Sequence, residues 1–383
     1  MPALLSWKCV SLDSEKIAYM LVSDITAYLE SISPLAYQED YDNCGLLVGD
    51  PGMEFHKALL CLDLTEEVMD EAVRLQCNLV ISHHPFIFRG LKKLTPGMPE
   101  TAILKLALIN NICLYAIHTN LDNTLNGLNA FVLSRLGMIN FSILSPKPGL
   151  LSKLAVFCPV GHAEKVRTAL FDAGAGHIGH YDCCSYNIDG EGTFRASNLA
   201  NPFVGGKNSI HFEKETRIEV IFPRYLETGI LKSLKASHPY EEVAFDIYPI
   251  DNTLAHCGAG IIGEFEHPVD ELEFLRLVKE NLGIPVIRHT ALRSSAVRRV
   301  ALCTGSGSFL IPEAIRSGAD AYLTADLKYH DFFIPANKLL LLDIGHYESE
   351  QWVKEWLYAA LIEKFPNFAF LISEVNTNPV HYL

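Results

Sequence analysis

Apolar runs of strand length alternate with amphipathic helical stretches through the first third of the chain. Three runs stand out as continuous apolar segments, and they are Lys57 to Leu64, Asn78 to Ser82 and Cys113 to Ile117. The first is followed by an acidic amphipathic stretch, Thr65 to Gln76, which predicts a helix. Strands that are buried on both faces of a parallel sheet have this continuous apolar pattern. The alternation therefore predicts an α/β layer architecture.

The pattern changes after Ser145 to Gly149 (SPKPG), a proline- and glycine-rich hinge. From Lys153 to Ile250 it predicts a strand, a helix, glycine-rich strands, another strand, a helix and a last strand. That order is the split β-α-β arrangement of a ferredoxin-like domain. The α/β pattern then resumes and ends in a long helix. We therefore predict one α/β domain in two halves, residues 17–148 and 252–383, interrupted by an α+β insertion over residues 149–251.

Candidate metal ligands lie where predicted strands end. His83 and His84 terminate one strand, Asp122 follows another, and His346 with Glu350 comes after the apolar run LLLLDI. Open parallel sheets bind ligands beyond the carboxyl ends of their strands. His346 and Glu350 are four residues apart and point the same way if one long final helix begins just before them.

This donor set suits zinc, iron or manganese, because imidazole nitrogen and carboxylate oxygen are borderline-to-hard ligands. Five ligands exceed the roughly three that a catalytic zinc takes from protein. We therefore expect two divalent ions per subunit, which would activate a water molecule near neutral pH and hold an anionic substrate. A single histidine at a strand end is more often an ordinary hydrogen-bonding residue. Neither spacing is as specific as H-E-x-x-H, which the chain lacks.

Three further features are candidates for a role at the site, and two of them have a second interpretation. The segment Gly305 to Ser308 (GSGS) either binds phosphate through backbone N–H groups or permits tight packing. His330 is a candidate catalytic residue for proton transfer, or simply a residue at the start of a helix. His118 is a candidate to hold Asp122 through a hydrogen bond.

Composition narrows the class of protein. The 383 residues are 49% hydrophobic and 20% charged, as in an ordinary globular protein too long for one core. No apolar run reaches the ~18 residues of a membrane span. The formal charge of −14 makes nucleic-acid binding unexpected. The ten cysteines form no C-x-x-C pair, which predicts reduced thiols and a cytoplasmic location. Residues 1–16 lack the features of a secretory signal.

Six ordered motifs together resemble the Nif-three-like family, also described as GTP cyclohydrolase I type 2 homologues. They are YDNCGLLVG (Tyr41 to Gly49), SHHPFIFRG (Ser82 to Gly90), HTNLDNTLNGLN (His118 to Asn129), CTGSGSF (Cys303 to Phe309), TADLKYHD (Thr324 to Asp331) and DIGHYESE (Asp343 to Glu350). The resemblance implies that His83, His84, Asp122, His346 and Glu350 occupy the family's metal-ligand positions. The first motif usually opens with tryptophan, and Tyr41 is a conservative departure from it.

The resemblance also implies that the middle block, including Ser237 to Ile250, is the PII-like or CutA-like insertion of longer bacterial members. It implies a toroidal homohexamer whose metal sites face an internal cavity. The function that it suggests is a metal-dependent hydrolase, in which a metal-bound hydroxide opens the guanine ring of GTP or attacks another nucleotide. Two alternatives stay open: a two-metal phosphatase or phosphodiesterase, and a non-catalytic ring that binds metal or a protein partner.

Overall fold

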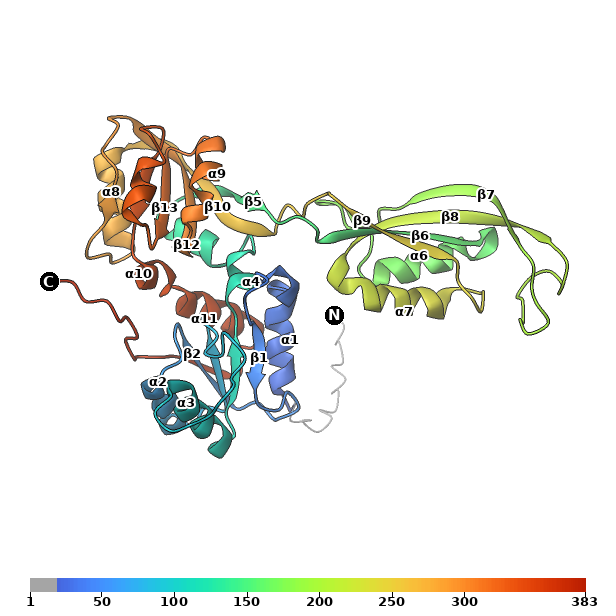
Figure 1. The fold of residues 1–383 in the computed structure, drawn as a ribbon, viewed down its shortest axis with the longest axis horizontal. Coiled ribbons are helices and arrows are strands. Elements are labelled where there is room, and N and C mark those ends of the chain that lie inside the picture. The colour runs from blue at the N-terminus through green and yellow to red at the C-terminus, as the bar shows by residue number, and fades with distance from the viewer. Residues whose placement is uncertain (1–18) are drawn as a thin grey trace, which may run out of the picture. The chain divides into compact units, whose positions relative to one another are not determined.

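A computed structural model describes residues 19–383, so the predictions made for residues 1–16 lie outside the described residues. The chain divides into two compact units. The first comprises the chain up to Asn120 together with Val353–His381, and the second comprises Leu121–Trp352 with the last two residues. Helices and strands alternate in both units, which confirms the predicted α/β class (Figure 1). No helix among the described residues is long and apolar enough to cross a membrane.

The first unit contains a five-stranded sheet in the order β1-β4-β3-β2-β15. Its strands are β1 (Gly45–Val48), β2 (Lys57–Cys61), β3 (Leu79–Ser82), β4 (Cys113–Ala116) and β15 (Ala369–Ile372). Four strands are parallel and β1 pairs antiparallel with β4. The helices of this unit are α1 (Val22–Ile32), α2 (Glu66–Arg74), α3 (Pro99–Ile109) and α11 (Val353–Lys364), with the short helix η1 (Leu35–Tyr37). The short helix α4 (Thr119–Asp122) follows β4.

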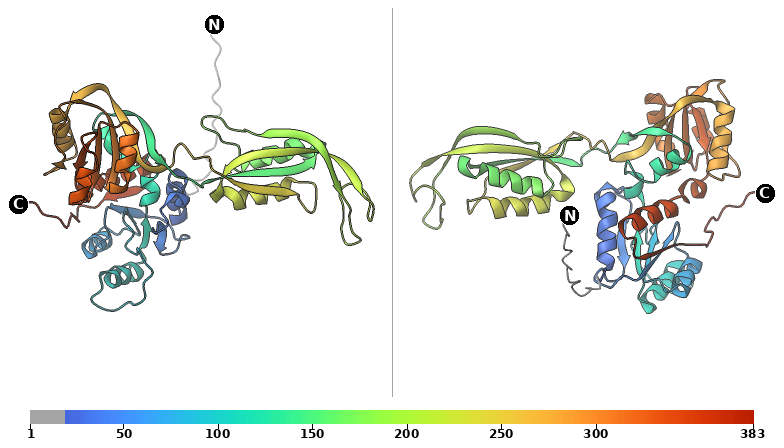
Figure 2. Two further views of the ribbon diagram at one scale, coloured as in Figure 1. Left: turned by 45° about the horizontal axis from the view of Figure 1, so that its top comes forward. Right: turned by 180° about the vertical axis from the view of Figure 1, so that it is seen from behind.

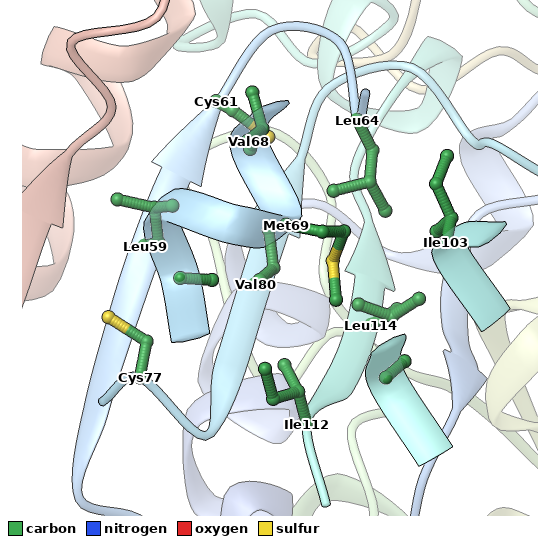
Figure 3. Packing of buried hydrophobic residues seen from close by; sticks show 12 residues of the cluster. Leu59, Cys61, Leu64, Val68, Met69, Cys77, Val80, Ile103, Ile112 and Leu114 are labelled. Carbon is green, nitrogen blue, oxygen red and sulfur yellow. The ribbon is translucent and has the colours of Figure 1, made fainter. Parts of the chain in front are cut away.

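A buried apolar cluster joins this sheet to α2 and α3. Leu59, Val80 and Leu114 come from three adjacent parallel strands, and they pack against Met69 of α2 and Ile103 of α3 (Figure 3). The continuous apolar character of these strands follows from this burial. The predicted strands β2, β3 and β4 are each confirmed to within a few residues.

The second unit contains a six-stranded sheet in the order β11-β14-β13-β12-β10-β5. Its strands are β5 (Ile139–Pro146), β10 (Gly258–Asp270), β11 (Arg288–His289), β12 (Ala296–Ser306), β13 (Ala321–Ala325) and β14 (Leu340–Asp343). Strands β12, β13 and β14 are parallel, and the other pairings are antiparallel. The helices near this sheet in sequence are α5 (Leu128–Arg135), α8 (Glu271–Asn281), η4 (Ser308–Leu310), α9 (Ile311–Arg316), η5 (Tyr329–Phe333) and α10 (His346–Glu350).

A separate four-stranded antiparallel sheet forms in the middle of the chain, in the order β7-β8-β6-β9. Its strands are β6 (Leu151–Pro159), β7 (Tyr186–Phe194), β8 (His211–Pro223) and β9 (Phe245–Ile250). The accompanying helices are α6 (Ala163–Asp172) and α7 (Glu227–Ser237), with η2 (Val160–His162) and η3 (Arg224–Leu226). Both long helices cover one face of the sheet, and a buried apolar cluster lies between them and the strands (Figures 1 and 2). We call residues 151–250 the β6–β9 block.

One local prediction was wrong, and another was correct only in part. The single long final helix is two helices, because α10 ends at Glu350 and α11 begins at Val353. These helices belong to different units, so the chain leaves one core before it enters the other. The predicted hinge at SPKPG is also partly a strand. Strand β5 continues to Pro146, where it pairs with Gly258 of β10.

Candidate metal centre

Three histidines of the first unit form a cluster beyond the carboxyl ends of two neighbouring strands. His83 and His84 follow β3, and His118 follows β4 after one intervening residue. The strands are parallel and in register, with Ser82 opposite Ala116, so the segments that leave them emerge at the same edge of the sheet. One ring nitrogen from each histidine lies within 4.8 Å of the others. The three nitrogens could therefore hold one metal ion.

Each of these histidines has a hydrogen-bond acceptor at its Nδ1 atom. The pairs are His83 with the Ile117 carbonyl oxygen (2.7 Å), His84 with Asp63 Oδ1 (2.7 Å) and His118 with Asp42 Oδ1 (2.9 Å). An acceptor at this position assigns the imidazole proton to Nδ1, and the neutral Nε2 atom then carries the lone pair that binds a metal. Carboxylates and carbonyls placed behind histidine ligands in this way fix the ring orientation in metal sites.

The two carboxylates behind the histidines are themselves anchored. Burial raises the pKa of the Asp42 carboxyl, but hydrogen bonds from His118, Thr119 and Asn43 outweigh burial and hold this pKa well below its usual range. Asp42 is therefore ionised at neutral pH. Asp63 accepts a second hydrogen bond, of 2.7 Å, from the Thr377 hydroxyl. Both carboxylates are thus fixed acceptors for the imidazole N–H groups.

A second group of candidate ligands lies in the other unit. Helix α10 begins at His346 and ends at Glu350. The Nε2 atom of His346 is 3.0 Å from Glu350 Oε2. The four-residue spacing places the two side chains on one face, as predicted, although the helix is short. On the other side of the ring, His346 Nδ1 is 2.7 Å from Asp326 Oδ2. This histidine therefore shows the same pairing of Nδ1 with a carboxylate.

The surroundings of His346 favour its protonated form in the metal-free protein. Its hydrogen bond to Glu350 is the main cause, burial opposes it, and the charges of Glu350 and Asp326 add to it, which raises the pKa of His346 to about 9. Glu350 is only 2% exposed. A buried carboxylate facing an imidazole provides the negative charge that a divalent cation requires.

The glycine-rich loop after β12 packs against Glu350. Gly305 has a φ of +62°, and a β-carbon there would collide with the Glu350 carboxylate. The Gly305 N–H group donates to Ser349 Oγ (2.9 Å), and its carbonyl accepts from Thr324 Oγ1 (3.1 Å). Of the two interpretations of this loop, the structure therefore favours tight packing over phosphate binding, because the Gly305 N–H group is used inside the protein.

We expect Gly305→Ala to disturb the site through Glu350. The β-carbon of an alanine at position 305 has to displace the Glu350 carboxylate, and the residue has to keep a left-handed backbone conformation. Together these should lower the free energy of unfolding by about 1–3 kcal/mol. Urea unfolding and metal analysis of the purified variant measure both effects. Gly161→Ala is the control, since position 161 has open space around it and no left-handed φ. Equal stability and equal metal content in the two variants would contradict this account of Gly305.

The remaining predicted site residues are placed as follows. Asp122 is the last residue of α4, partly buried, and its carbonyl accepts a 2.9 Å hydrogen bond from Asn129 Nδ2. We predicted that His118 holds Asp122 through a hydrogen bond. Its Nδ1 atom is paired with Asp42 instead. His330 is exposed on η5, with its ring edge-on to Tyr329 at 5.2 Å. Its catalytic role stays a prediction.

Sequence reasoning missed the three carboxylates behind the histidines. Asp63 lies two residues after β2 and Asp326 one residue after β13, so the carboxyl-end rule could have identified both. Asp42 lies in the loop before β1, where that rule does not apply. It belongs to the first of the six motifs, which was the available signal.

Comparison with known proteins matches nearly all of the described chain to one family. The model described as Duf34/NIF3 (NGG1p interacting factor 3) matches residues 20–379. The GTP cyclohydrolase 1 type 2 homolog of Bacillus subtilis is 36% identical over 368 residues, covering 94% of this chain and 98% of that protein. The homolog of Staphylococcus epidermidis is 33% identical over 368 residues, covering 95% of this chain and 100% of that protein.

Solved structures show the same similarity. The crystal structure of a Bacillus cereus protein related to NIF3 has a TM-score of 0.81 at 34% identity, and the match covers 95% of this chain and 100% of that one. The Staphylococcus aureus protein SA1388 has a TM-score of 0.75 at 28% identity, with 96% and 100% covered. The mixed α/β fold is therefore shared along nearly the entire length.

Proposed function

Because this chain belongs to the Duf34/NIF3 family, we propose that it is a divalent-metal protein with hydrolase activity. The proposed ligands are His83, His84, Asp122, His346 and Glu350, and the expected occupancy is two ions per subunit. One observation carries the proposal: each histidine among them has an oxygen acceptor at Nδ1, which leaves Nε2 as the metal-binding atom.

The donor types fit zinc, iron or manganese, because they are imidazole nitrogens and carboxylate oxygens. A bound divalent ion would supply Lewis acidity, polarising a substrate oxygen and lowering the pKa of a water molecule. The chain itself would supply the rest. Asp63 holds the His84 ring, and Asp326 holds the His346 ring. His118 adds a third imidazole beside His83 and His84, with Asp42 behind it.

The proposed substrate is GTP or another nucleotide, as the names of the B. subtilis and S. epidermidis relatives suggest. Hydrolysis at guanine C8 would consume two water molecules, one to open the imidazole ring and one to cleave the resulting formamide and release formate. His330 is proposed as a proton-transfer residue. The phosphodiesterase alternative loses its main support, because the Gly305 N–H group is engaged by Ser349. A non-catalytic metal-binding ring is the outcome that the experiment below separates from a hydrolase.

We also propose the domain organisation predicted from the sequence, with a ferredoxin-like, PII- or CutA-like insertion over residues 149–251. The order β6-α6-β7-β8-α7-β9 and the antiparallel sheet β7-β8-β6-β9 support it. The strands that flank the block also support it, since Pro146 of β5 lies opposite Gly258 of β10. The chain therefore leaves and re-enters the six-stranded sheet at neighbouring positions.

We also propose that the protein is cytoplasmic and forms a homohexamer. Light scattering of the purified protein tests this assembly.

The activity test measures formate released from GTP by metal-reconstituted protein. Wild-type protein should release formate, and His83→Ala and Glu350→Ala should not. His56→Ala is the matched control, because His56 is an exposed histidine of the first unit. Metal binding without formate release would favour the non-catalytic alternative. Equal release by all four proteins would show that the activity arises elsewhere.

The apparent affinity for metal should rise with pH. The raised pKa of His346, about 9, means that the metal-free site holds a proton at neutral pH. A metal ion must displace this proton, so apparent affinity should rise from about pH 6 to about pH 9 and level off above it. Chelator-competition titrations measure the affinity. Asp326→Asn should shift the plateau to lower pH, because it removes one of the charges that raise the pKa. A flat profile between these pH values would contradict the assignment.

A further inference from the structure

The β6–β9 block contains a cavity of about 390 Å³ whose lining is aromatic and acidic. The side chains that give it this character are Phe157, Phe194, Phe203, Tyr240, Glu215 and Glu241. The volume is within the range of small-molecule sites, about 300–1,000 Å³. The connection between β7 and β8, residues 195–210, supplies part of the wall and bends away from the end of that hairpin (Figure 1).

Three of the rings lie close to one another in the lining of the cavity. The Tyr240 ring centroid is 6.4 Å from that of Phe194 and 6.3 Å from that of Phe203. The interplanar angles are 59° and 52°, so the rings are tilted rather than stacked on one another. Aromatic faces carry negative electrostatic potential and attract cations.

The acidic side chains are built into the wall. Glu215 Oε1 accepts a 2.8 Å hydrogen bond from the Tyr240 hydroxyl. Gly192 leaves space for this carboxylate, because a β-carbon there would collide with it. Glu241 Oε1 accepts a 2.7 Å hydrogen bond from the Asn201 N–H group, which ties the β7–β8 connection to the segment after α7.

Several basic side chains lie beside rings that line the cavity. Arg217 lies 5.7 Å from the centroid of the Phe157 ring and is paired with Glu219 at 2.8 Å. Burial lowers the pKa of His238, which favours its neutral form. His162 lies edge-on to Phe203 at 5.3 Å. Among the described residues that line the cavity, none is lysine, arginine or histidine.

We propose that this cavity binds a small organic cation with a methylated ammonium head group. Aromatic rings and carboxylates in the lining of one cavity match the apolar surface and the positive charge of such a group. An inorganic cation would have to lose its hydration shell to contact the rings, and a neutral apolar ligand would gain little from the carboxylates. The proposal does not depend on metal binding or on hydrolase activity.

Calorimetric titration of the full chain with choline tests the proposal. Choline should bind saturably, and its neutral carbon isostere, 3,3-dimethylbutan-1-ol, should bind at least about tenfold more weakly, because only the charge differs. Equal binding of the two would overturn the proposal in favour of a purely apolar pocket. Absence of choline binding up to about 50 mM would also overturn it, since even weak sites saturate in that range.

Variants locate the site. Phe203→Ala and Glu215→Gln should each weaken choline binding about tenfold. Phe203 is half-exposed, so its truncation should leave the fold intact, and circular dichroism checks this. Tyr248→Ala is the control, because Tyr248 is a half-exposed aromatic residue of β9 that does not line the cavity. An equal loss of affinity in the Tyr248 variant, or unchanged affinity in both cavity variants, would overturn the assignment.

Discussion

His84→Ala should retain almost none of the metal that the wild-type protein binds. The substitution removes a proposed metal-binding nitrogen, and it leaves the Asp63 carboxylate without its imidazole partner. We expect a loss in affinity of at least about 100-fold, since removal of an outer partner alone costs 10- to 100-fold. Metal analysis after dialysis against a weak chelator measures the retained metal. His56→Ala, the exposed control, should retain wild-type amounts.

Asp63→Asn separates the metal-binding role of His84 from the way its ring is held. The asparagine amide can still accept a hydrogen bond from Nδ1, but it lacks the charge that makes the ring more basic. We therefore expect an intermediate loss of about 10- to 100-fold in affinity. The order wild type, Asp63→Asn, His84→Ala is the prediction. Equal metal content in all three proteins would show that these residues have an ordinary structural role.

Much of the fold was predictable because its central strands are apolar on both faces. Strands β2, β3 and β4 were predicted to within a few residues. The strands that the prediction missed include β1, β5, β10 and β15, which pair antiparallel or come from distant sequence. β15 begins at Ala369 and pairs with β2, which begins at Lys57. No local pattern encodes such a pairing.

The candidate ligands were predictable for a related reason. The carboxylates that pair with the histidine rings were not predicted. Ligands that follow parallel strands share an edge of the sheet, which the strand pattern already indicates. Asp42 lies beside His118 for a different reason. Strand β1 runs antiparallel to β4, with Gly45 opposite Ala116, so the loop before β1 meets the segment after β4. That proximity depends on the pairing of an edge strand, which the sequence pattern does not reveal.

A second large effect is expected at a buried ion pair outside the histidine clusters, between Glu271 and Arg293. Glu271 opens α8 and is 2% exposed. Its carboxylate is 2.9 Å from Arg293 Nε and accepts hydrogen bonds from the backbone N–H groups of Arg293 (2.7 Å) and Ser294 (2.9 Å). Arg293 also donates to the Lys338 carbonyl at 3.0 Å. The pair thus joins the start of α8 to the segments before β12 and β14.

We expect Arg293→Ala to lower the free energy of unfolding by about 3–5 kcal/mol, because it leaves a buried carboxylate without its cation. Arg276→Ala is the matched control. Arg276 pairs with Glu273 on the same helix at 3.5 Å, but both side chains are more than half exposed. Solvent screens such pairs, so the control should change stability by no more than about 0.5 kcal/mol. Urea denaturation of both variants measures the difference. Similar stability in the two would mean that backbone N–H groups alone satisfy Glu271, and that the arginine contributes no more than a surface charge does.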